Sequence, residues 1–302
     1  QGGPFPIIKV GRSALTNAVF IAVLLKAAFG VPYVYDMDSC ISRQLVERYP
    51  FLAPLSDLLS GCERIAVANA KAIVPVCDAL AADAEKYRPA RVKILPDTPM
   101  VTSRIPGQRE NLRAQLGIHG WLAMYVGNLE PYQGVDLLLE SVAIARKKTN
   151  SLNLVIIGGR PEDIRTYQRQ ARNLGIHREV HFMGPRPVEC LGAYLSQADI
   201  LISPRTKGNN TPMKIYSYLE SGTAICATRL PMHTQVLNDQ VAMLVEPLPE
   251  RLADGMLRLI GDERLREALG SAAKRMVSER FSPREFVDRV NEVYDWLGTE
   301  VA

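Results

Sequence analysis

An α/β fold with parallel sheets is the fold class that this sequence predicts, and two observations support it. From Trp121 onward, short apolar runs bounded by Gly, Pro or Asp alternate with stretches of helical periodicity. Strands that alternate with helices form parallel sheets, and helices then cover both faces. The length sets the scale, because 302 residues of which 47% are hydrophobic can build two medium-sized domains.

The second half of the chain carries the clearest elements. Its predicted strands are apolar runs over residues 121–127, 152–159, 179–184, 199–204, 223–228 and 241–246. The predicted helices between them cover residues 135–148, 162–175 and 188–197. Ligands of such sheets bind at the carboxyl ends of the strands, so the loops after these runs are expected to hold the site.

The first third of the chain has the same kind of pattern. It predicts a buried helix over residues 14–30, strands over 31–36 and 72–76, and helices over 42–70 and 78–87. Strands and helices alternate here too, so this part is also expected to be α/β.

Composition suggests where the domains meet. Residues 97–111 mix proline, glycine and polar residues and are the predicted linker. We therefore assign residues 1–110 to a first domain and residues 111–281 to a second. A last helix is predicted within residues 282–302, with Pro283 at its first position, and we expect it to pack back on the first domain.

Charge and cysteine content exclude several classes of protein. A net charge of +4 is too balanced for a nucleic-acid-binding protein. Five cysteines without CxxC spacing argue against a zinc site or a disulfide framework, and they fit the reducing cytoplasm. The apolar run 14–30 contains Asn17 and Lys26, which interrupt it too much for a membrane span. A slight excess of basic residues over 1–120 favours a weak peripheral contact with an anionic membrane surface.

A predicted helix start follows the strand over residues 199–204. Asn210 or Thr211 suits the N-cap, Pro212 the first helical position and Gly222 the residue after the end. The first turn of a helix has free amides and a positive dipole end, which suit an anion such as phosphate. Most helix starts bind only water, so the basic residues around this one add to the argument: Arg205, Lys207 and Lys214.

The loop after the strand 121–127 is the second candidate. The segment MYVGNLEPYQGVDLLLE places Gly127 and Gly134 in a loop that leads into a helix, with Asp136 in the first turn. The segment lacks the GxGxxG pattern of dinucleotide-binding proteins, and GxxxxGK[ST] is absent from the chain. The sequence therefore argues against a nicotinamide-dependent enzyme and against a simple nucleoside triphosphatase.

Residues 121–281 resemble the nucleotide-binding domain of retaining glycosyltransferases of the GT-B fold, family 4, also called glycosyl transferases group 1. The segments that carry the resemblance are YVGNLEPYQGVDLLLESVA, LNLVIIGG, VHFMGPRP, ADILISP, TPMKIYSYLESGTAICAT and LPMHTQVLNDQVAMLVEP. The first third resembles the later part of the partner domain, through GVPYVYDMDS and VKILPD. The resemblance implies two Rossmann-like domains facing a cleft. Since the chain starts at Gln1 and lacks the usual glycine-rich first strand, the first domain is expected to be incomplete and the second complete.

The resemblance also implies an activity. Such enzymes move a sugar from a nucleotide diphosphate sugar to an acceptor hydroxyl with retention of configuration. We expect neither a metal nor a cofactor, because the nucleotide sugar is a substrate. The acceptor is expected to be a glycan, a lipid-linked molecule or a small molecule, in polysaccharide or glycoconjugate synthesis. The protein is expected to be cytoplasmic, with a peripheral location at the inner membrane face as the variant.

Residue roles follow from the same resemblance. Lys214 and Arg205 are expected to bear the leaving diphosphate, and Asp38 to face the acceptor. Asp36 is assigned to the acceptor side with it, and the alternative for both aspartates is that they cap the next helix. The remaining donor-binding candidates are Gly127, Asn128, Glu130, Gln133, Gly134, Gly184, Lys207, Asn209, Asn210, Thr211, Ser217 and Glu220.

The sequence departs from the family pattern at the cations of the first loop. Asn128 stands where the family usually has an arginine, and Gln133 where it has a lysine. Asn128, Glu130, Tyr132 and Gln133 are all hydrogen-bonding residues, and Arg205, Lys207 and Lys214 add charge nearby. We interpret the chain as a subfamily whose cations have been relocated.

The two family glutamates are also replaced. Asn209 and Ser217 occupy their positions, and Glu220, one helical turn on, is a candidate substitute at the ribose. These losses keep a second interpretation open, a non-catalytic nucleotide-sugar-binding or assembly protein on the same fold. A third, an epimerase, would need an acidic and histidine cluster that the sequence does not show.

Three further residues carry alternatives from the sequence. His233 either lines the cleft or caps a helix at the surface. Tyr216 and Tyr218 are interpreted as packing residues rather than as platforms for sugar rings.

Overall fold

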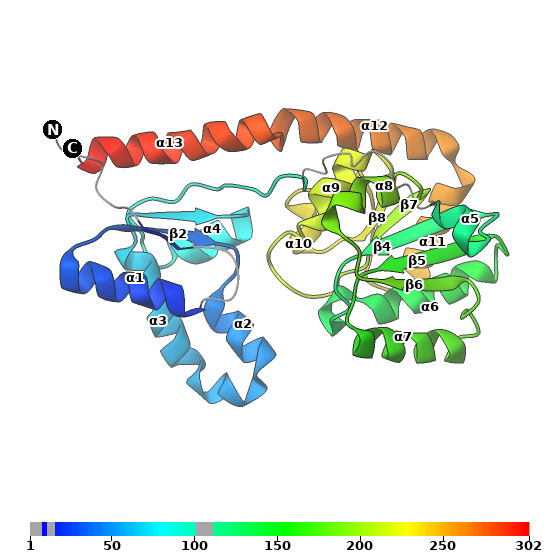
Figure 1. Ribbon diagram of the computed structural model, residues 1–302, viewed down its shortest axis with the longest axis horizontal. Helices are drawn as coiled ribbons and strands as arrows, with labels where there is room; N and C mark the ends of the chain where they lie inside the picture. Colours follow the sequence, from blue (N-terminus) through cyan, green and yellow to red (C-terminus); the bar gives the residue numbers. More distant parts are fainter. Residues whose placement is uncertain (1–7, 11–15, 101–110, 302) are drawn as a thin grey trace. The chain divides into compact units, whose positions relative to one another are not determined.

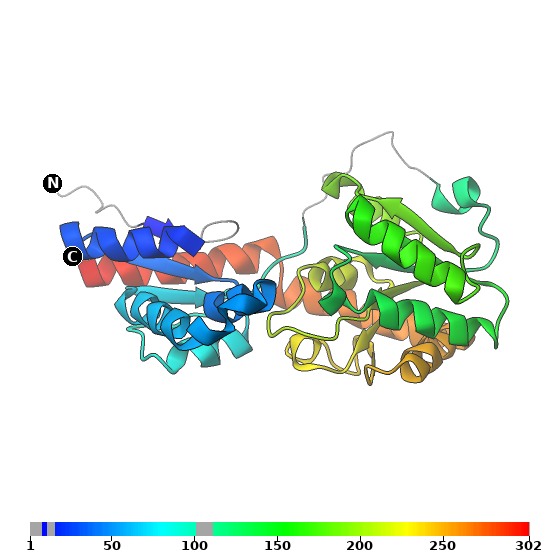
Figure 2. The ribbon, with the colours of Figure 1, turned by 90° about the horizontal axis from the view of Figure 1, so that it is seen from below.

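The computed structural model describes residues 8–10, 16–100 and 111–301 and divides the chain into two compact units. The first unit comprises Gln1–Asp97, Asn209–Thr211 and Pro283–Ala302, and the second Thr98–Gly208 and Pro212–Ser282. Most of the predicted linker, residues 101–110, lies outside the described residues. Each unit has a parallel sheet with helices packed on it (Figure 1 and Figure 2), which confirms the predicted α/β class.

The second unit is built on a six-stranded parallel sheet. Its order is β6-β5-β4-β7-β8-β9, so the sheet grows outward in two directions from β4 and β7. The strands are β4 (Trp121–Val126), β5 (Leu152–Ile157), β6 (Val180–Gly184), β7 (Ile200–Ser203), β8 (Ala224–Thr228) and β9 (Met243–Val245). All six lie where apolar runs predicted them.

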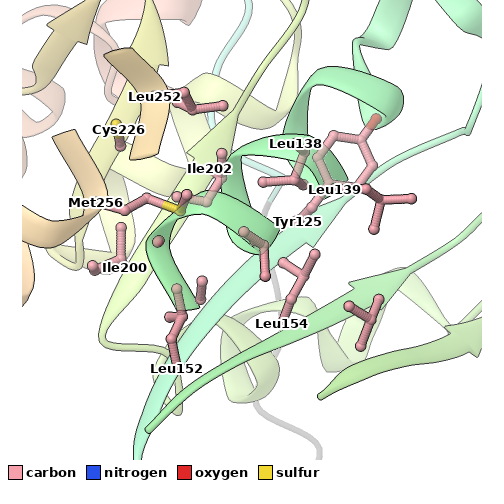
Figure 3. Close-up of a cluster of buried hydrophobic side chains, with 14 of the residues drawn as sticks. Tyr125, Leu138, Leu139, Leu152, Leu154, Ile200, Ile202, Cys226, Leu252 and Met256 are labelled. Atoms are coloured by element: carbon pink, nitrogen blue, oxygen red, sulfur yellow. The ribbon is translucent and has the colours of Figure 1, made fainter. Parts of the chain in front are cut away.

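Helices cover both faces of this sheet because successive residues of a strand point to opposite faces. Ala123 and Tyr125 of β4 pack with one set of helices, α6 (Val135–Arg146), α7 (Pro161–Asn173) and α11 (Pro249–Gly261). Figure 3 shows this cluster, with Leu138 of α6 and Leu154 of β5 in it. Leu122 and Met124 pack with the other set, α5 (Leu112–Leu116), α8 (Leu191–Leu195), α9 (Lys214–Ser221) and α12 (Glu263–Arg280).

Three short helices complete the second unit. They are η2 (Pro131–Gln133) after β4, η3 (Val188–Cys190) after β6 and α10 (Pro231–Thr234) after β8. η2 follows the central strand β4, and α10 follows β8, the neighbour of β7. Both therefore lie in loops at the carboxyl edge of the sheet.

The first unit has a three-stranded parallel sheet in the order β1-β2-β3. Its strands are β1 (Ile8–Val10), β2 (Tyr33–Met37) and β3 (Ala72–Pro75). Its helices before the linker are α1 (Thr16–Phe29), α2 (Ile41–Arg48), η1 (Pro50–Leu55), α3 (Ser56–Asn69) and α4 (Asp78–Glu85).

The last helix, α13 (Pro283–Val301), belongs to the first unit. Its residues Val293 and Leu297 are buried in one cluster with Val34 and Val74, from β2 and β3. The helix begins at the proline that the sequence marked, because a proline at this position gives up an amide that has no helical partner anyway.

The helix α1 corrects one prediction. Ala22 is buried, but Ile21, Leu24 and Phe29 are 54%, 67% and 74% exposed, so α1 is not a buried helix. Its apolar character therefore did not indicate burial on all sides. In the part of the chain that the structure describes, no helix is long and apolar enough to cross a membrane.

The core of the second unit gives a stability prediction. Leu154 is fully buried in the cluster of Figure 3, so Leu154→Ala should leave a cavity and lower the free energy of unfolding by about 3 kcal/mol. Leu248, which is 48% exposed, is the matched control, and Leu248→Ala should change that free energy by less than about 0.5 kcal/mol. Urea unfolding of both variants measures the difference, and equal losses would contradict the assigned core.

Candidate functional site

The candidate site of the second unit lies where the strand order of the sheet reverses. β4 and β7 are neighbours, with Met124 paired to Leu201, yet β5 and β6 continue on one side and β8 and β9 on the other. Ligands of parallel α/β sheets bind at such a switch point, at the carboxyl ends of the strands. The loops after β4 and β7 are the two that the sequence singled out.

Two glycines bring these loops into contact. Gly134 has φ 71°, and a Cβ there would lie 2.1 Å from the carbonyl oxygen of Pro204. The Thr206 amide also donates to the carbonyl of Tyr132 at 2.9 Å. Gly127 has φ 149°, and a Cβ there would lie 3.0 Å from the Lys214 Nζ. Gly134 therefore needs glycine for reasons of space as well as backbone conformation, and Gly127 for its backbone conformation.

Lys214 points from the start of α9 toward the loop after β4. Its Nζ lies 3.8 Å from the centre of the Tyr125 ring and donates to Gln133 Oε1 at 3.3 Å. The Tyr125 hydroxyl donates to the carbonyl of Asn128 at 2.7 Å. The ammonium thus rests on an aromatic face and an amide oxygen, both of which attract a cation.

The charge of Lys214 is not balanced by a carboxylate. Within residues 16–100 and 111–301, no ion pair includes Lys214. Burial, followed by the nearby positive charge of Arg205, holds the pKa of the Lys214 ammonium well below its ordinary value. An anion placed here would remove both penalties, because it would offset the lost hydration and the repulsion.

Arg205 follows β7 and is held by its own loop. It is 8% exposed, its Nε donates to the carbonyl of Lys207 at 2.8 Å, and its guanidinium lies 5.1 Å from the centre of the Tyr132 ring. Gly208 has φ 112°, and a Cβ there would lie 2.2 Å from the Arg205 Nη2. The glycine therefore makes room for the guanidinium, whereas Lys207 itself is exposed.

His233 lies beneath this loop, which corrects both interpretations of it. It is fully buried, so it neither lines a cleft nor caps a helix at the surface. Its Nδ1 donates to the carbonyl of Thr228 at 2.8 Å, and its Nε2 accepts from Ser203 Oγ at 2.8 Å. The Thr228 hydroxyl donates to the carbonyl of Arg205 at 2.6 Å. His233 thus joins the ends of β7 and β8 under Arg205.

The ring of His233 is neutral at physiological pH. Burial is the largest cause, and with the charges of Lys214 and Arg205 it lowers the pKa of His233 to about 4. A carbonyl only accepts, so the proton of the neutral ring is on Nδ1 and Nε2 is free to accept from Ser203.

The start of α9 differs from the prediction. The helix begins at Lys214 with Met213 as its N-cap, rather than at Pro212 with Asn210 or Thr211 as the cap. The chain first makes a tight turn in which the Ile215 amide donates to the carbonyl of Pro212 at 2.9 Å. Gly222 ends the helix with φ 70°, as predicted.

Thr211 lies just before this turn, and its hydroxyl does not cap the helix. Thr211 is 3% exposed, and within the described residues its Oγ1 has no hydrogen-bond partner. The predicted capping bond is therefore not made.

The remaining donor-side candidates lie in different surroundings. Ser217 is buried, and its Oγ accepts from the Met100 amide at 3.2 Å, while Glu220 is exposed. Gly184, at the end of β6, accepts from the Gly158 amide at 2.8 Å. Half-buried or exposed positions are Glu130, Asn209, Asn210 and Asn128. The role of this set at the nucleotide stays a prediction.

In the first unit, the structure contradicts the capping alternative for the aspartates. The N-cap of α2 is Cys40, and the Ile41 amide at the helix start donates to Glu63 Oε1 at 2.8 Å. Asp36 is buried in β2, and Asp38 follows the strand and is half-buried. Neither aspartate caps α2, so their acceptor-side role stays a prediction.

Several residues of the site were not predicted from the sequence. Tyr125 supports Lys214, and Ser203 and Thr228 connect His233 to the loop of Arg205. The available signal was their position, since each lies at the carboxyl end of a predicted strand that borders the site. Tyr216 and Tyr218 are buried as predicted, and the Tyr218 hydroxyl also accepts from the Val126 amide at 2.9 Å.

The described residues contain no group of three or more His, Cys, Asp or Glu side chains that could hold a metal ion. Lys214 and Arg205 are cations, which suit an anionic ligand.

Solved structures identify the class of fold. Sucrose-phosphate synthase from Thermosynechococcus elongatus superposes with a TM-score of 0.76 at 17% identity, over 94% of this chain and 72% of that one. The Anabaena protein HepE, solved in complex with UDP, gives 0.78 at 16% identity, over 97% of this chain and 78% of that one. This likeness confirms the predicted GT-B class of α/β fold.

The family follows from the sequence. The family model described as glycosyl transferases group 1 matches residues 98–276, which is more than half of the chain. The chain belongs to this family, as its resemblance predicted.

Two relatives from corynebacteria carry the name D-inositol 3-phosphate glycosyltransferase. The protein of Corynebacterium aurimucosum is 28% identical over 265 residues, and that of Corynebacterium glutamicum (strain R) 26% identical over 265 residues. Each alignment covers 83% of this chain and 63% of the relative. The chain therefore spans somewhat less than two thirds of the length of these relatives.

The buried histidine gives a pH prediction. Because the pKa of His233 is about 4 in the folded protein and about 6.5 unfolded, the unfolded chain binds the proton more strongly. Its contribution is therefore fully present above the unfolded value and is lost as the pH falls from there toward 4, by about 3 kcal/mol. Urea unfolding at several pH values measures this loss, and His233→Gln should make the slope shallower. The same slope in both proteins would contradict a buried neutral ring.

Proposed function

We propose that this protein transfers a sugar from a nucleotide diphosphate sugar to an acceptor hydroxyl, with retention of configuration and without a metal. The observation that carries the proposal is the ammonium of Lys214, held at the switch point beside Arg205 and paired with no carboxylate of the described residues. Membership of the glycosyl transferases group 1 family names the reaction class that would use such a site.

Transfer of a sugar from such a donor requires positive groups next to the leaving diphosphate. When the sugar leaves the donor, negative charge grows on the departing diphosphate. Fixed cations and amides aimed at that charge stabilise the transition state without reorganising. Lys214 is fixed by Tyr125 and Gln133, and Arg205 by its own loop, so both are held in place before the donor arrives. The backbone amides near Thr211 are proposed to act with them.

The position of Gln133 supports the relocation of a family cation. The family usually has a lysine at this position, and the structure places the Lys214 Nζ 3.3 Å from the Gln133 side chain. Lys214 therefore brings a positive charge, from the other loop, to the place that the family lysine would occupy. We propose that this exchange keeps the diphosphate site charged.

The neighbours suggest the first donor to test. HepE of Anabaena was solved with UDP and with UDP-glucose, so UDP is the first probe for this chain. Asp38 is proposed to face the acceptor, which is a glycan, a lipid-linked molecule or a small molecule. A cytoplasmic role in polysaccharide or glycoconjugate synthesis is part of the same proposal.

Exchanging the charge tests the site. Lys214→Met should weaken UDP binding by about tenfold or more, because a charge-assisted contact is lost. Adding Gln133→Lys to that variant should restore most of the affinity, since the charge returns at the neighbouring position. Calorimetry without metal, and then with magnesium, measures both changes.

The control for this exchange is Lys148→Met, which removes an exposed lysine that is distant from Lys214 in the sequence. Unchanged UDP affinity and unchanged kcat/KM in Lys214→Met would contradict the proposed site. Binding of UDP that needs Lys214, together with no turnover of any donor, would favour the non-catalytic interpretation that Asn209 and Ser217 keep open.

The depressed pKa of Lys214 gives a further prediction. Only the protonated ammonium attracts a diphosphate, so binding should raise the pKa of Lys214 and take up a proton. The affinity should therefore fall as the pH rises above the pKa of the free protein, by up to about tenfold per pH unit. Calorimetry in buffers of different ionisation enthalpy measures the uptake. In Lys214→Met the uptake should vanish, and its persistence there would assign it to another group.

A further inference from the structure

Three polar side chains lie in the core beneath the loop of Arg205. Ser203 ends β7, Thr228 ends β8 and His233 lies in α10, and each of the three is 0% exposed. We call them the buried network. Burying polar groups costs free energy unless each finds a hydrogen-bond partner, and apolar residues would serve packing alone. The hydrogen bonds of the network therefore indicate its role.

The buried network holds the backbone of the loop at two points. Ser203 Oγ donates to His233 Nε2 at 2.8 Å, and the Thr228 hydroxyl donates to the carbonyl of Arg205 at 2.6 Å. The two points are joined, because His233 Nδ1 donates to the Thr228 carbonyl at 2.8 Å and lies 3.0 Å from the Thr228 hydroxyl. The segment from Ser203 to Arg205 is thus fixed at both ends, and the residue between them is a proline with a restricted φ.

The side chain of Arg205 extends from this fixed backbone through close contacts. Its Nε donates to the Lys207 carbonyl at 2.8 Å, and its guanidinium lies 5.1 Å from the centre of the Tyr132 ring. Because a hydrogen bond weakens steeply with distance and angle, a displaced backbone would break the contact with Lys207. The direction of the guanidinium therefore depends on the carbonyl that Thr228 holds.

We infer that His233 is a positioning residue of the diphosphate site, which acts through Arg205 and touches no substrate itself. The ring suits this role because a neutral imidazole donates from one nitrogen and accepts at the other, with a fixed distance between them. A charged ring could not accept from Ser203, and the lowered pKa of His233 keeps the ring neutral.

This inference rests on the proposed function, because that function gives Arg205 its ligand. A cation that is ordered beforehand binds an anion more tightly, since no free energy is spent on ordering it during binding. The order that the network imposes on Arg205 can also be measured without a ligand, so the two ideas can be tested separately.

Thr228 offers a matched pair of variants. Thr228→Val removes the hydroxyl at nearly constant volume and should weaken UDP binding about tenfold, because Arg205 must then be ordered when the diphosphate binds. Thr228→Ser keeps the hydroxyl and should keep the affinity within about twofold. His233→Gln lacks a donor at the Nδ1 position and should resemble Thr228→Val. Calorimetry measures the affinities, and urea unfolding shows that each variant is folded.

A double-mutant cycle shows whether the network acts through Arg205. In an Arg205→Met background, His233→Gln should change the UDP affinity by less than about twofold, because the cation that it positions is gone. In a Lys214→Met background, His233→Gln should still weaken binding about tenfold, because Lys214 rests on Tyr125 and not on the network. Equal losses in both backgrounds would overturn the inference and leave the network to the stability of the fold.

Nitrogen-15 NMR follows the order of Arg205 without UDP. The Nε proton of Arg205 is bonded to the Lys207 carbonyl, so it should exchange slowly with water in the wild type and in Thr228→Ser. In Thr228→Val the exchange should be about tenfold faster or more, and Arg205→Met assigns the signal. Equal exchange in the wild type and both Thr228 variants would overturn the inference. The expected exchange rates without any UDP binding by the wild type would support it and contradict the proposed function instead.

Discussion

The placement of one ammonium between an aromatic face and an amide oxygen is the interaction on which the candidate site depends. Lys214 reaches Tyr125 and Gln133 only because β4 and β7 are neighbours, although Lys214 and Gln133 are 81 positions apart in the chain. Holding a partly buried cation costs free energy, and no carboxylate paired with it in the described residues offsets that cost. An anion bound next to Lys214 would offset this cost.

The layer beneath the site explains how it keeps its shape. His233 connects the ends of β7 and β8, and Thr228 passes the connection to the carbonyl of Arg205. A neutral ring is needed there, because a charged one would add to the repulsion that Lys214 and Arg205 already experience. The neutral, buried histidine thus supports the loop of Arg205 without adding a charge to the site.

In the first unit, too, a buried side chain connects two elements. The start of α2 takes its cap from Glu63, a residue of the neighbouring helix α3, rather than from the aspartates before it. Asp38, at the end of β2, is therefore not used as the cap of α2. The carboxylate of Glu63 instead fixes the start of α2 against α3.

Local features of the sequence determined the strands, the α/β class and two helix boundaries. Apolar runs identify buried strands because a parallel strand is covered on both faces, and Pro283 and Gly222 act through the backbone conformation of a single residue. The predicted helix start after residues 199–204 and the family resemblance of residues 121–281 both made Lys214 and Arg205 candidates. Only the tertiary structure decided that α9 begins after a tight turn, that His233 is buried, and which aromatic ring supports the ammonium. The burial of His233 and the ring that supports the ammonium depend on contacts between segments far apart in the chain, where packing outweighs the preferences of neighbouring residues.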